Sequence, residues 1–135
     1  MIQYLTLGQV LLIAEEVTDI EVATLLHITR LDLLASAVAL PQTELIGLDP
    51  YPELSDKAAV LAFHIARNHA LPDGNKRLAF LSAFEFCWIN GFELVFNIDS
   101  AERIFFDLAG GKLSLQELST WIASAMENRE NGELK

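Results

Sequence analysis

The chain has 135 residues, a formal net charge of −10, one cysteine and 52% apolar residues. This length is typical of one domain, and the apolar fraction excludes a disordered chain. The single cysteine, Cys87, excludes a disulfide framework within one chain, and the negative charge argues against nucleic acid as a direct partner.

No targeting or membrane segment is expected. The first residues lack the basic stretch of a signal peptide, and Glu15 and Glu16 soon interrupt the apolar run. The longest nearly apolar stretch, Leu78–Ile89, is shorter than the roughly 20 residues that a membrane helix needs. We therefore expect a cytoplasmic protein that makes no membrane contact.

Helical spacing of apolar residues dominates the first part of the chain. A capping box that begins at Thr6 predicts the first helix, and a similar box at Thr18 predicts a short helix over Ile20–His27. A third helix, Leu31–Leu40, is expected to stop at Pro41, because proline disfavours helical backbone in the residue before it.

The middle of the chain predicts a long loop and then a buried helix. Gln42–Glu53 contains glycine and two prolines and is the best candidate for the loop. Ser55 or Asp56 is expected to cap a helix that runs to about His69. Residues 70–74 must again form a loop, because they contain a proline followed by Asp-Gly.

The remainder of the chain predicts three more helices and one short extended segment. In order, these are a helix from Asn75 to Asn90, the segment Phe92–Phe96, a helix from Ser100 to Gly110, and a helix from Ser114 through Met126. The polar tail 127–135 is expected to be frayed. The predicted fold is therefore all-α, a compact single-domain helical bundle over residues 1–126, with room for one very short strand or hairpin.

Charge is distributed unevenly along the chain. Residues 57–77 contain Lys57, Arg67, Lys76 and Arg77 but only one acid, Asp73, so this segment carries +3 and the other residues carry −13. Three of these cations fall close to the predicted start of a helix. Local positive charge at such a place, in an otherwise acidic chain, indicates an anion site.

The residue types at this helix start suit a phosphate group. The first residues of a helix have unpaired backbone N–H groups, and Gly74 lets an anion approach the backbone of Asn75 and Lys76 closely. Lys76 would add charge, and Arg77 could bind a phosphate through two parallel hydrogen bonds.

Two further residues of the segment can carry out chemistry. His69, at the end of the preceding helix, can take a proton from a hydroxyl near neutral pH. The carboxylate of Asp73 could hold Mg²⁺ that bridges phosphates. A base, a metal carboxylate and an anion cradle are the parts required for nucleotide-dependent transfer to a hydroxyl.

Each residue also has a plain structural interpretation. Asp73 with Gly74 is a common turn pair, His69 continues an apolar helix stripe, and Arg67 could be a solvated helix residue. His64 and His27 are best explained without function. The combination of six chemistry-bearing residue types between His69 and Arg77 favours the functional interpretation.

The pattern HxxxDGNKR, from His69 to Arg77, resembles the signature of the Fic/Doc family. Lysine directly after Asn75 is similar to the Doc (death-on-curing) branch, whereas Fic proteins usually have glycine there. The resemblance covers most of residues 4–126, including the segment before the first helix and both helices that flank the motif.

The resemblance implies an all-helical toxin of a toxin–antitoxin pair that transfers the γ-phosphate of ATP to a threonine of elongation factor Tu. His69 would be the catalytic base, and Asp73 would bind Mg²⁺ or orient the nucleophile. Gly74, Asn75, Lys76 and Arg77 would bind the nucleotide phosphates, and Arg67 matches a basic residue of the Doc branch. A Phd-like antitoxin is expected to dock a helix in a surface groove.

Two other functions stay open at this point. A Fic-type protein adenylyltransferase is one, although Lys76 would fill the space that the family's glycine leaves for that nucleotide pose. A catalytically silent protein that binds an antitoxin or a nucleotide is the other, because Leu71, Pro72 and Leu81 depart from the family pattern.

Overall fold

The computed structural model describes residues 1–129 of the chain. Within them lie seven α-helices, one turn of 3₁₀ helix and two short strands. In chain order the elements are α1 (Leu7–Thr18), α2 (Val22–Ile28), α3 (Leu31–Ala39), η1 (Leu40–Gln42), α4 (Leu54–Asn68), α5 (Asn75–Ile89), β1 (Phe92–Leu94), α6 (Ile98–Ala109), α7 (Leu115–Ala125) and β2 (Met126–Asn128). The predicted all-α class is confirmed.

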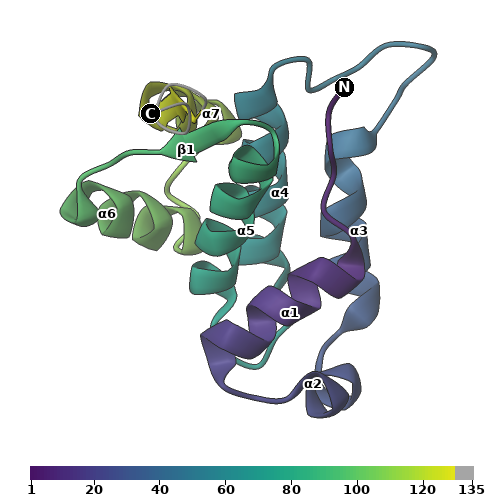
Figure 1. The fold of residues 1–135 in the computed structure, drawn as a ribbon. Coiled ribbons are helices and arrows are strands. Elements are labelled where there is room, and N and C mark those ends of the chain that lie inside the picture. The colour runs from purple at the N-terminus through teal and green to yellow at the C-terminus, as the bar shows by residue number, and fades with distance from the viewer. Residues whose placement is uncertain (130–135) are drawn as a thin grey trace.

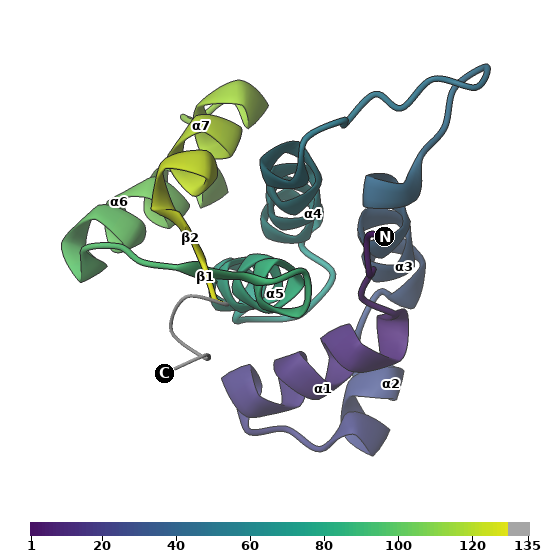
Figure 2. The same cartoon turned by 45° about the horizontal axis from the view of Figure 1, so that its top comes forward.

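The helices form layers around a central antiparallel pair, α4 and α5 (Figure 1). Helices α1, α2 and α3 lie on one side of this pair, and α6 and α7 lie on the other (Figure 2). Helix α1 packs against α5, and α3 packs against α4. The short connection between α4 and α5 therefore lies at one end of the bundle, between the two outer layers.

Helix α4 is buried on nearly all sides because both outer layers pack against it. The apolar stripe predicted from helical spacing is buried, at Ala58, Leu61, Ala62, Ile65 and Ala66. Residues outside that stripe, such as Ala59 and Val60, are buried as well. Small side chains at Ala58, Ala62 and Ala66 let the neighbouring helices approach closely.

Two predicted helix starts are confirmed in full. At Thr6 and at Ser114 the side chain accepts a backbone hydrogen bond from the third helical residue, whose own side chain bonds back. The predicted N-cap of α4, Ser55 or Asp56, was two or three residues late. Glu53 is its N-cap, and Asp56, at the third helical position, completes a capping box. A glutamate can serve this role because its carboxylate accepts the same hydrogen bond as the smaller capping side chains.

Other predicted boundaries were also wrong. Helix α6 begins at Ile98 instead of Ser100, because the side chain of Asn97 accepts a hydrogen bond from the Ser100 backbone N–H. Thr18 does not cap α2: it is the last residue of α1, and Asp19 follows in left-handed conformation with φ 59°.

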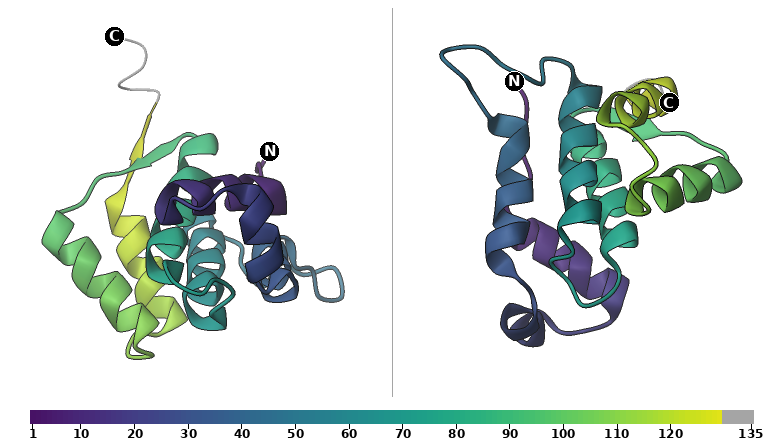
Figure 3. Two further views of the ribbon diagram at one scale, coloured as in Figure 1. Left: turned by 90° about the horizontal axis from the view of Figure 1, so that it is seen from below. Right: turned by 180° about the vertical axis from the view of Figure 1, so that it is seen from behind.

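The end of the described chain forms a strand. β2 pairs antiparallel with β1, with Glu93 opposite Glu127 (Figure 3). The prediction of a frayed tail from residue 127 is therefore wrong for residues 127–129, where backbone pairing orders the chain and the Arg129 backbone N–H donates to Gly91. The rest of that predicted tail lies outside the described residues.

Within residues 1–129, no single helix is long and apolar enough to cross a membrane. One strongly bent pair, Val22–Ile28 with Leu31–Gln42, meets the criteria of length and composition when the two are taken together.

A buried lysine fastens the long loop between η1 and α4. The Lys57 side chain is only 3% exposed, and its Nζ donates to the Pro41 carbonyl at 3.1 Å and to Asp49 Oδ2 at 2.7 Å. The ammonium also lies 5.9 Å from the centre of the Tyr4 ring. Lys57 therefore joins the N-terminal segment, the loop and α4.

We predict that Lys57→Ala lowers the free energy of unfolding by about 2–3 kcal/mol, because it removes charge-assisted hydrogen bonds and leaves a buried carbonyl unpaired. Arg30→Ala, which removes an ion pair with both partners about two-thirds exposed, is the control and should change stability little. The Lys57 hydrogen bond lowers the pKa of Asp49, so the share of the stabilisation that comes from this carboxylate should be present at neutral pH and lost as the pH falls below about 3.8. Urea denaturation at several pH values measures both effects, and equal losses in the two variants would contradict the prediction.

Candidate active site

The segment His69–Gly74 turns the chain from α4 into α5. His69 is the C-cap of α4 and has left-handed backbone, with φ 53° and ψ 44°. This conformation turns its side chain away from the buried stripe that ends at Ala66, and His69 is exposed. The structural alternative of a core-edge histidine is therefore wrong.

Hydrogen bonds and burial hold this turn in one shape. Leu71 is 3% exposed and belongs to the main core. Its backbone N–H donates to Asn75 Oδ1 at 3.0 Å, and its carbonyl accepts from Asn75 Nδ2 at 2.9 Å. From the α2–α3 side, the Arg30 backbone N–H donates to the Ala70 carbonyl at 2.8 Å. The side chain of Asn75 thus braces the loop, and only its backbone is left for a ligand.

Gly74 begins α5 at a place that other residues would not fit. It is the N-cap, with φ 89°, where L side chains are strained. A Cβ at this position would lie 3.2 Å from Val17 Cγ1 and 3.3 Å from Thr18 Cγ2. The end of α1 therefore packs directly on the turn, and Gly74 has a structural role in addition to the phosphate contact expected of it.

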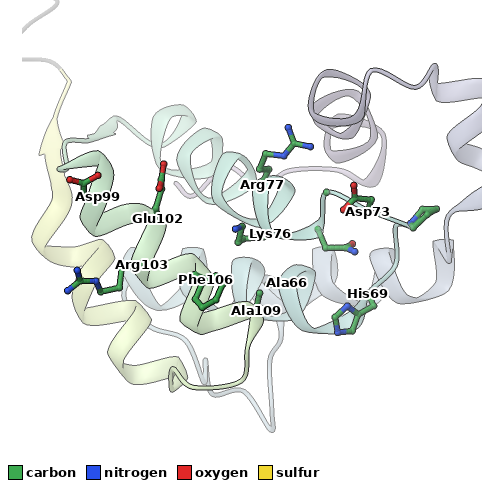
Figure 4. A pocket seen from close by; sticks show the side chains of 13 residues that line it. Ala66, His69, Asp73, Lys76, Arg77, Asp99, Glu102, Arg103, Phe106 and Ala109 are labelled. Carbon is green, nitrogen blue, oxygen red and sulfur yellow. The ribbon is translucent and has the colours of Figure 1, made fainter.

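A cleft of about 1100 Å³ lies between this turn and helix α6. It brings together six of the seven predicted site residues: His69, Asp73, Gly74, Asn75, Lys76 and Arg77. Figure 4 shows His69 and Asp73 at one end of the cleft, and Lys76 pointing towards Phe106 of α6. The motif residues thus face one space that is large enough for a nucleotide.

Arg67 is the predicted residue that the structure does not bring into the cleft. Its guanidinium lies 5.4 Å from the centre of the Phe63 ring, and it would be within 3.5 Å of a Cβ added to Gly111. Arg67 therefore contacts the turn between α6 and α7.

Sequence reasoning missed the opposite wall of the cleft. That wall is formed by residues of α6 at helical spacing: Asp99, Glu102, Arg103, Phe106 and Ala109. The available signal was the pair Phe105–Phe106, since adjacent residues on a helix cannot both point into the same core. Phe105 is 3% exposed and Phe106 is 65% exposed.

The side of the cleft at the start of α5, which carries Lys76 and Arg77, can attract an anion. Within the part of the chain that the structure describes, neither Lys76 nor Arg77 forms an ion pair. Lys76 Nζ instead lies 5.7 Å from the centre of the Phe106 ring. Two cations at a helix N-terminus are unfavourable for the helix itself, so a bound anion would relieve this cost.

Other reactive groups do not contribute to the cleft. Burial raises the pKa of the Cys87 thiol to about 12, so this thiol is protonated and inert at neutral pH. His64 does not line the cleft, and burial, together with the nearby Arg67, lowers its pKa. His69 is therefore the histidine that faces the cleft.

Comparison with known proteins agrees with the geometry. The profile of the Fic/DOC family matches residues 4–87, more than half of the chain. A protein named Toxin Doc, from Mycolicibacterium smegmatis, is 42% identical over 102 residues, which cover 74% of this chain and 78% of that protein. The chain therefore belongs to the Fic/Doc family, as its HxxxDGNKR motif predicts.

We predict that Gly74→Ala destabilises the fold more than Gly91→Ala does. Both glycines have φ near 90°, but nothing lies within 4 Å of a Cβ built on Gly91. The strain common to both variants should cost about 1 kcal/mol. The contact with Val17 and Thr18 should cost Gly74→Ala about 1–3 kcal/mol more. Thermal and urea unfolding measure the difference, and equal stability of the variants would show that α1 does not constrain the turn.

Proposed function

We propose that the protein is a Doc-like toxin of a toxin–antitoxin system, which transfers the γ-phosphate of ATP to a hydroxyl of a protein target. The observation that carries this proposal is the single cleft shared by His69, Asp73 and the cationic start of α5. The relative named Toxin Doc supports the assignment as a toxin. The resemblance to the Doc branch suggests a threonine of elongation factor Tu as the acceptor, and hence inhibition of translation in the cytoplasm.

In this mechanism His69 takes the proton of the acceptor hydroxyl. The hydroxyl oxygen forms a bond to the γ-phosphorus while the bond from that phosphorus to the β-phosphate oxygen breaks, and ADP leaves with the electron pair. The exposed position of His69 leaves it accessible to a protein substrate. Lys76, Arg77 and the first backbone N–H groups of α5 hold the phosphate oxygens as negative charge shifts onto the leaving group.

The cleft could hold Mg²⁺ through one protein carboxylate together with the phosphates of the ligand. Among the described residues there is no group of three or more His, Cys, Asp or Glu side chains that could hold a metal. Asp73 is the exposed carboxylate on the α4–α5 side of the cleft, beside the cations that would bind phosphate. One carboxylate with phosphate oxygens and water is the arrangement that Mg²⁺ commonly adopts, and the ion would supply further charge neutralisation there.

Transfer of phosphate is favoured over transfer of an adenylyl group because of Lys76. Its side chain projects into the cleft towards Phe106, where a glycine would leave open space (Figure 4). Of the three departures from the family pattern, Leu71 and Leu81 lie outside the cleft and Pro72 lines it. Leu71 is in the core and anchors the turn, and Leu81 does not line the catalytic cleft.

The test is incubation of the purified protein with Mg-ATP and elongation factor Tu, with the radioactive label at either the γ or the α position. We expect the γ label to be transferred. His69→Gly should lower the transfer rate by at least about 100-fold, because general base catalysis typically contributes that much. The free energy of unfolding should be unchanged or raised by up to about 1 kcal/mol, because glycine tolerates the left-handed backbone at this position.

His27→Ala, on the exposed surface of α2, is the matched control and should leave transfer unchanged. Transfer of the α label would identify an adenylyltransferase instead. A folded protein that transfers neither label but still binds nucleotide or antitoxin would support the catalytically silent alternative.

We further propose that a Phd-like antitoxin docks a helix in an apolar groove beside the cleft. The groove, of about 430 Å³, is lined by Lys76, Arg77, Phe80, Leu81, Phe96, Ile98, Ala101, Glu102 and Phe105. Lys76, Arg77 and Glu102 belong to both the groove and the cleft. A helix seated in the groove would therefore contact the residues proposed to hold the nucleotide, which accounts for inhibition.

Leu81→Arg should lower affinity for a Phd-like antitoxin by about tenfold or more, because it places a charge in the apolar groove. Leu12→Arg, on the exposed face of α1, is the control and should bind as the wild type does. Titration calorimetry measures both affinities. Equal affinities of the two variants would exclude this groove as the docking site.

A further inference from the structure

The two walls of the catalytic cleft have opposite chemistry. The wall at the start of α5 has backbone N–H groups and the cations Lys76 and Arg77. The wall formed by α6 has two carboxylates, Asp99 and Glu102, one cation, Arg103, and the ring of Phe106. A ligand that fills the cleft should therefore have an anionic end and an uncharged, aromatic end.

The Phe106 ring is exposed for a structural reason. Its neighbour Phe105 packs edge to face against Phe80, with ring centres 5.2 Å apart, and against Trp121, with centres 6.1 Å apart. The step of about 100° between adjacent helical residues turns Phe106 away from this cluster and into the cleft. At 65% exposure, the ring leaves most of its surface available to a ligand.

The surroundings of the ring leave space for a flat group. Ala66 and Ala109 line the same cleft, and their small side chains do not fill it. Figure 4 shows both alanines near Phe106, with Lys76 approaching the ring from the α5 side. Lys76 thus lies beside the ring, at the place where a base would stack. The phosphates of a bound polyphosphate would draw its ammonium group away from the ring and towards the start of α5.

The carboxylates of α6 determine the orientation of the ligand. Asp99 and Glu102 would repel phosphate groups along this wall, but they can accept hydrogen bonds from the hydroxyl and amino groups of a nucleoside. The α6 wall carries two carboxylates against one cation, Arg103, whereas the start of α5 carries two cations, so the balance of charge favours the phosphates at α5 and the nucleoside at α6.

We infer that α6 is the nucleoside-binding wall and that Phe106 stacks on the base of a nucleoside polyphosphate. This inference rests on the proposed function, since it assigns the base of the same nucleotide. Helix α6 lies beyond residues 4–87, which the family profile matches, so the motif itself does not indicate this role.

The test compares two ligands with three phosphate groups, one that has a nucleoside and one that has none. Calorimetry with the non-hydrolysable ATP analogue AMP-PNP and with inorganic tripolyphosphate, each with Mg²⁺, is carried out on the wild type, Phe106→Ala, Phe106→Trp and Lys76→Ala. Phe106→Ala should bind AMP-PNP about tenfold more weakly, because base stacking on an aromatic side chain contributes about that much. Its affinity for tripolyphosphate should stay within about twofold, and Lys76→Ala should weaken both ligands.

Phe106→Trp should keep the affinity for AMP-PNP, and its added indole fluorescence should be quenched by AMP-PNP but not by tripolyphosphate. Leu12→Ala, an exposed apolar residue of α1, is the control for general effects of truncation. If Phe106→Ala binds AMP-PNP as the wild type does, or weakens both ligands equally, the inference is overturned while the proposed function stands. If the wild type binds neither ligand, the proposed function and the inference both fail.

Discussion

The turn between α4 and α5 is the constraint on which the site depends. Its backbone must reverse direction between two buried helices while leaving His69 and the first N–H groups of α5 accessible. The side chain of Asn75 meets both backbone groups of Leu71, and the Leu71 side chain is held in the core. A loop fixed from both sides in this way holds its neighbouring residues in one geometry, as catalysis requires.

Residues with left-handed backbone, His69 and Gly74, stand at the two ends of this turn. The reason for that conformation differs between them. Gly74 is required by its backbone and by the end of α1 packed against it. His69 also has left-handed backbone without being glycine, at a cost of about 1 kcal/mol. Glycine would remove this strain but also the imidazole, so the histidine at this position is better explained by chemistry than by stability.

The layered fold explains why the cleft lies where it does. Helix α4 is covered on both sides, so the surface left beside the turn is bounded by α5 and α6. Helix α6 buries Ala101, Phe105 and Leu108 and therefore turns its other face towards the cations of α5. Packing of the aromatic cluster around Phe105 thus determines which side chains face a ligand.

Local signals predicted much of this arrangement, and long-range contacts accounted for the errors. The boxes at Thr6 and Ser114 and the spacing from His69 to Arg77 depend on neighbouring residues. The structure has both boxes, and the predicted site residues between His69 and Arg77 line one cleft. The pairing of β1 with β2 and the α6 wall depend on residues far apart in sequence, so periodicity alone did not indicate them. Arg67 shows the same limit, since the α6–α7 turn takes it away from the motif that it adjoins in sequence.

Charge connects the stability of this fold to ligand binding. The chain carries −10 overall, yet Lys76 and Arg77 stand at a helix N-terminus, where the helix dipole opposes them and, within residues 1–129, no acidic side chain pairs with them. An anion bound there removes a local repulsion that the unliganded fold retains. Because ligand binding to the folded state alone stabilises it by about 2.7 kcal/mol at 100 times Kd, nucleotide should raise the stability of the turn and α5 in particular.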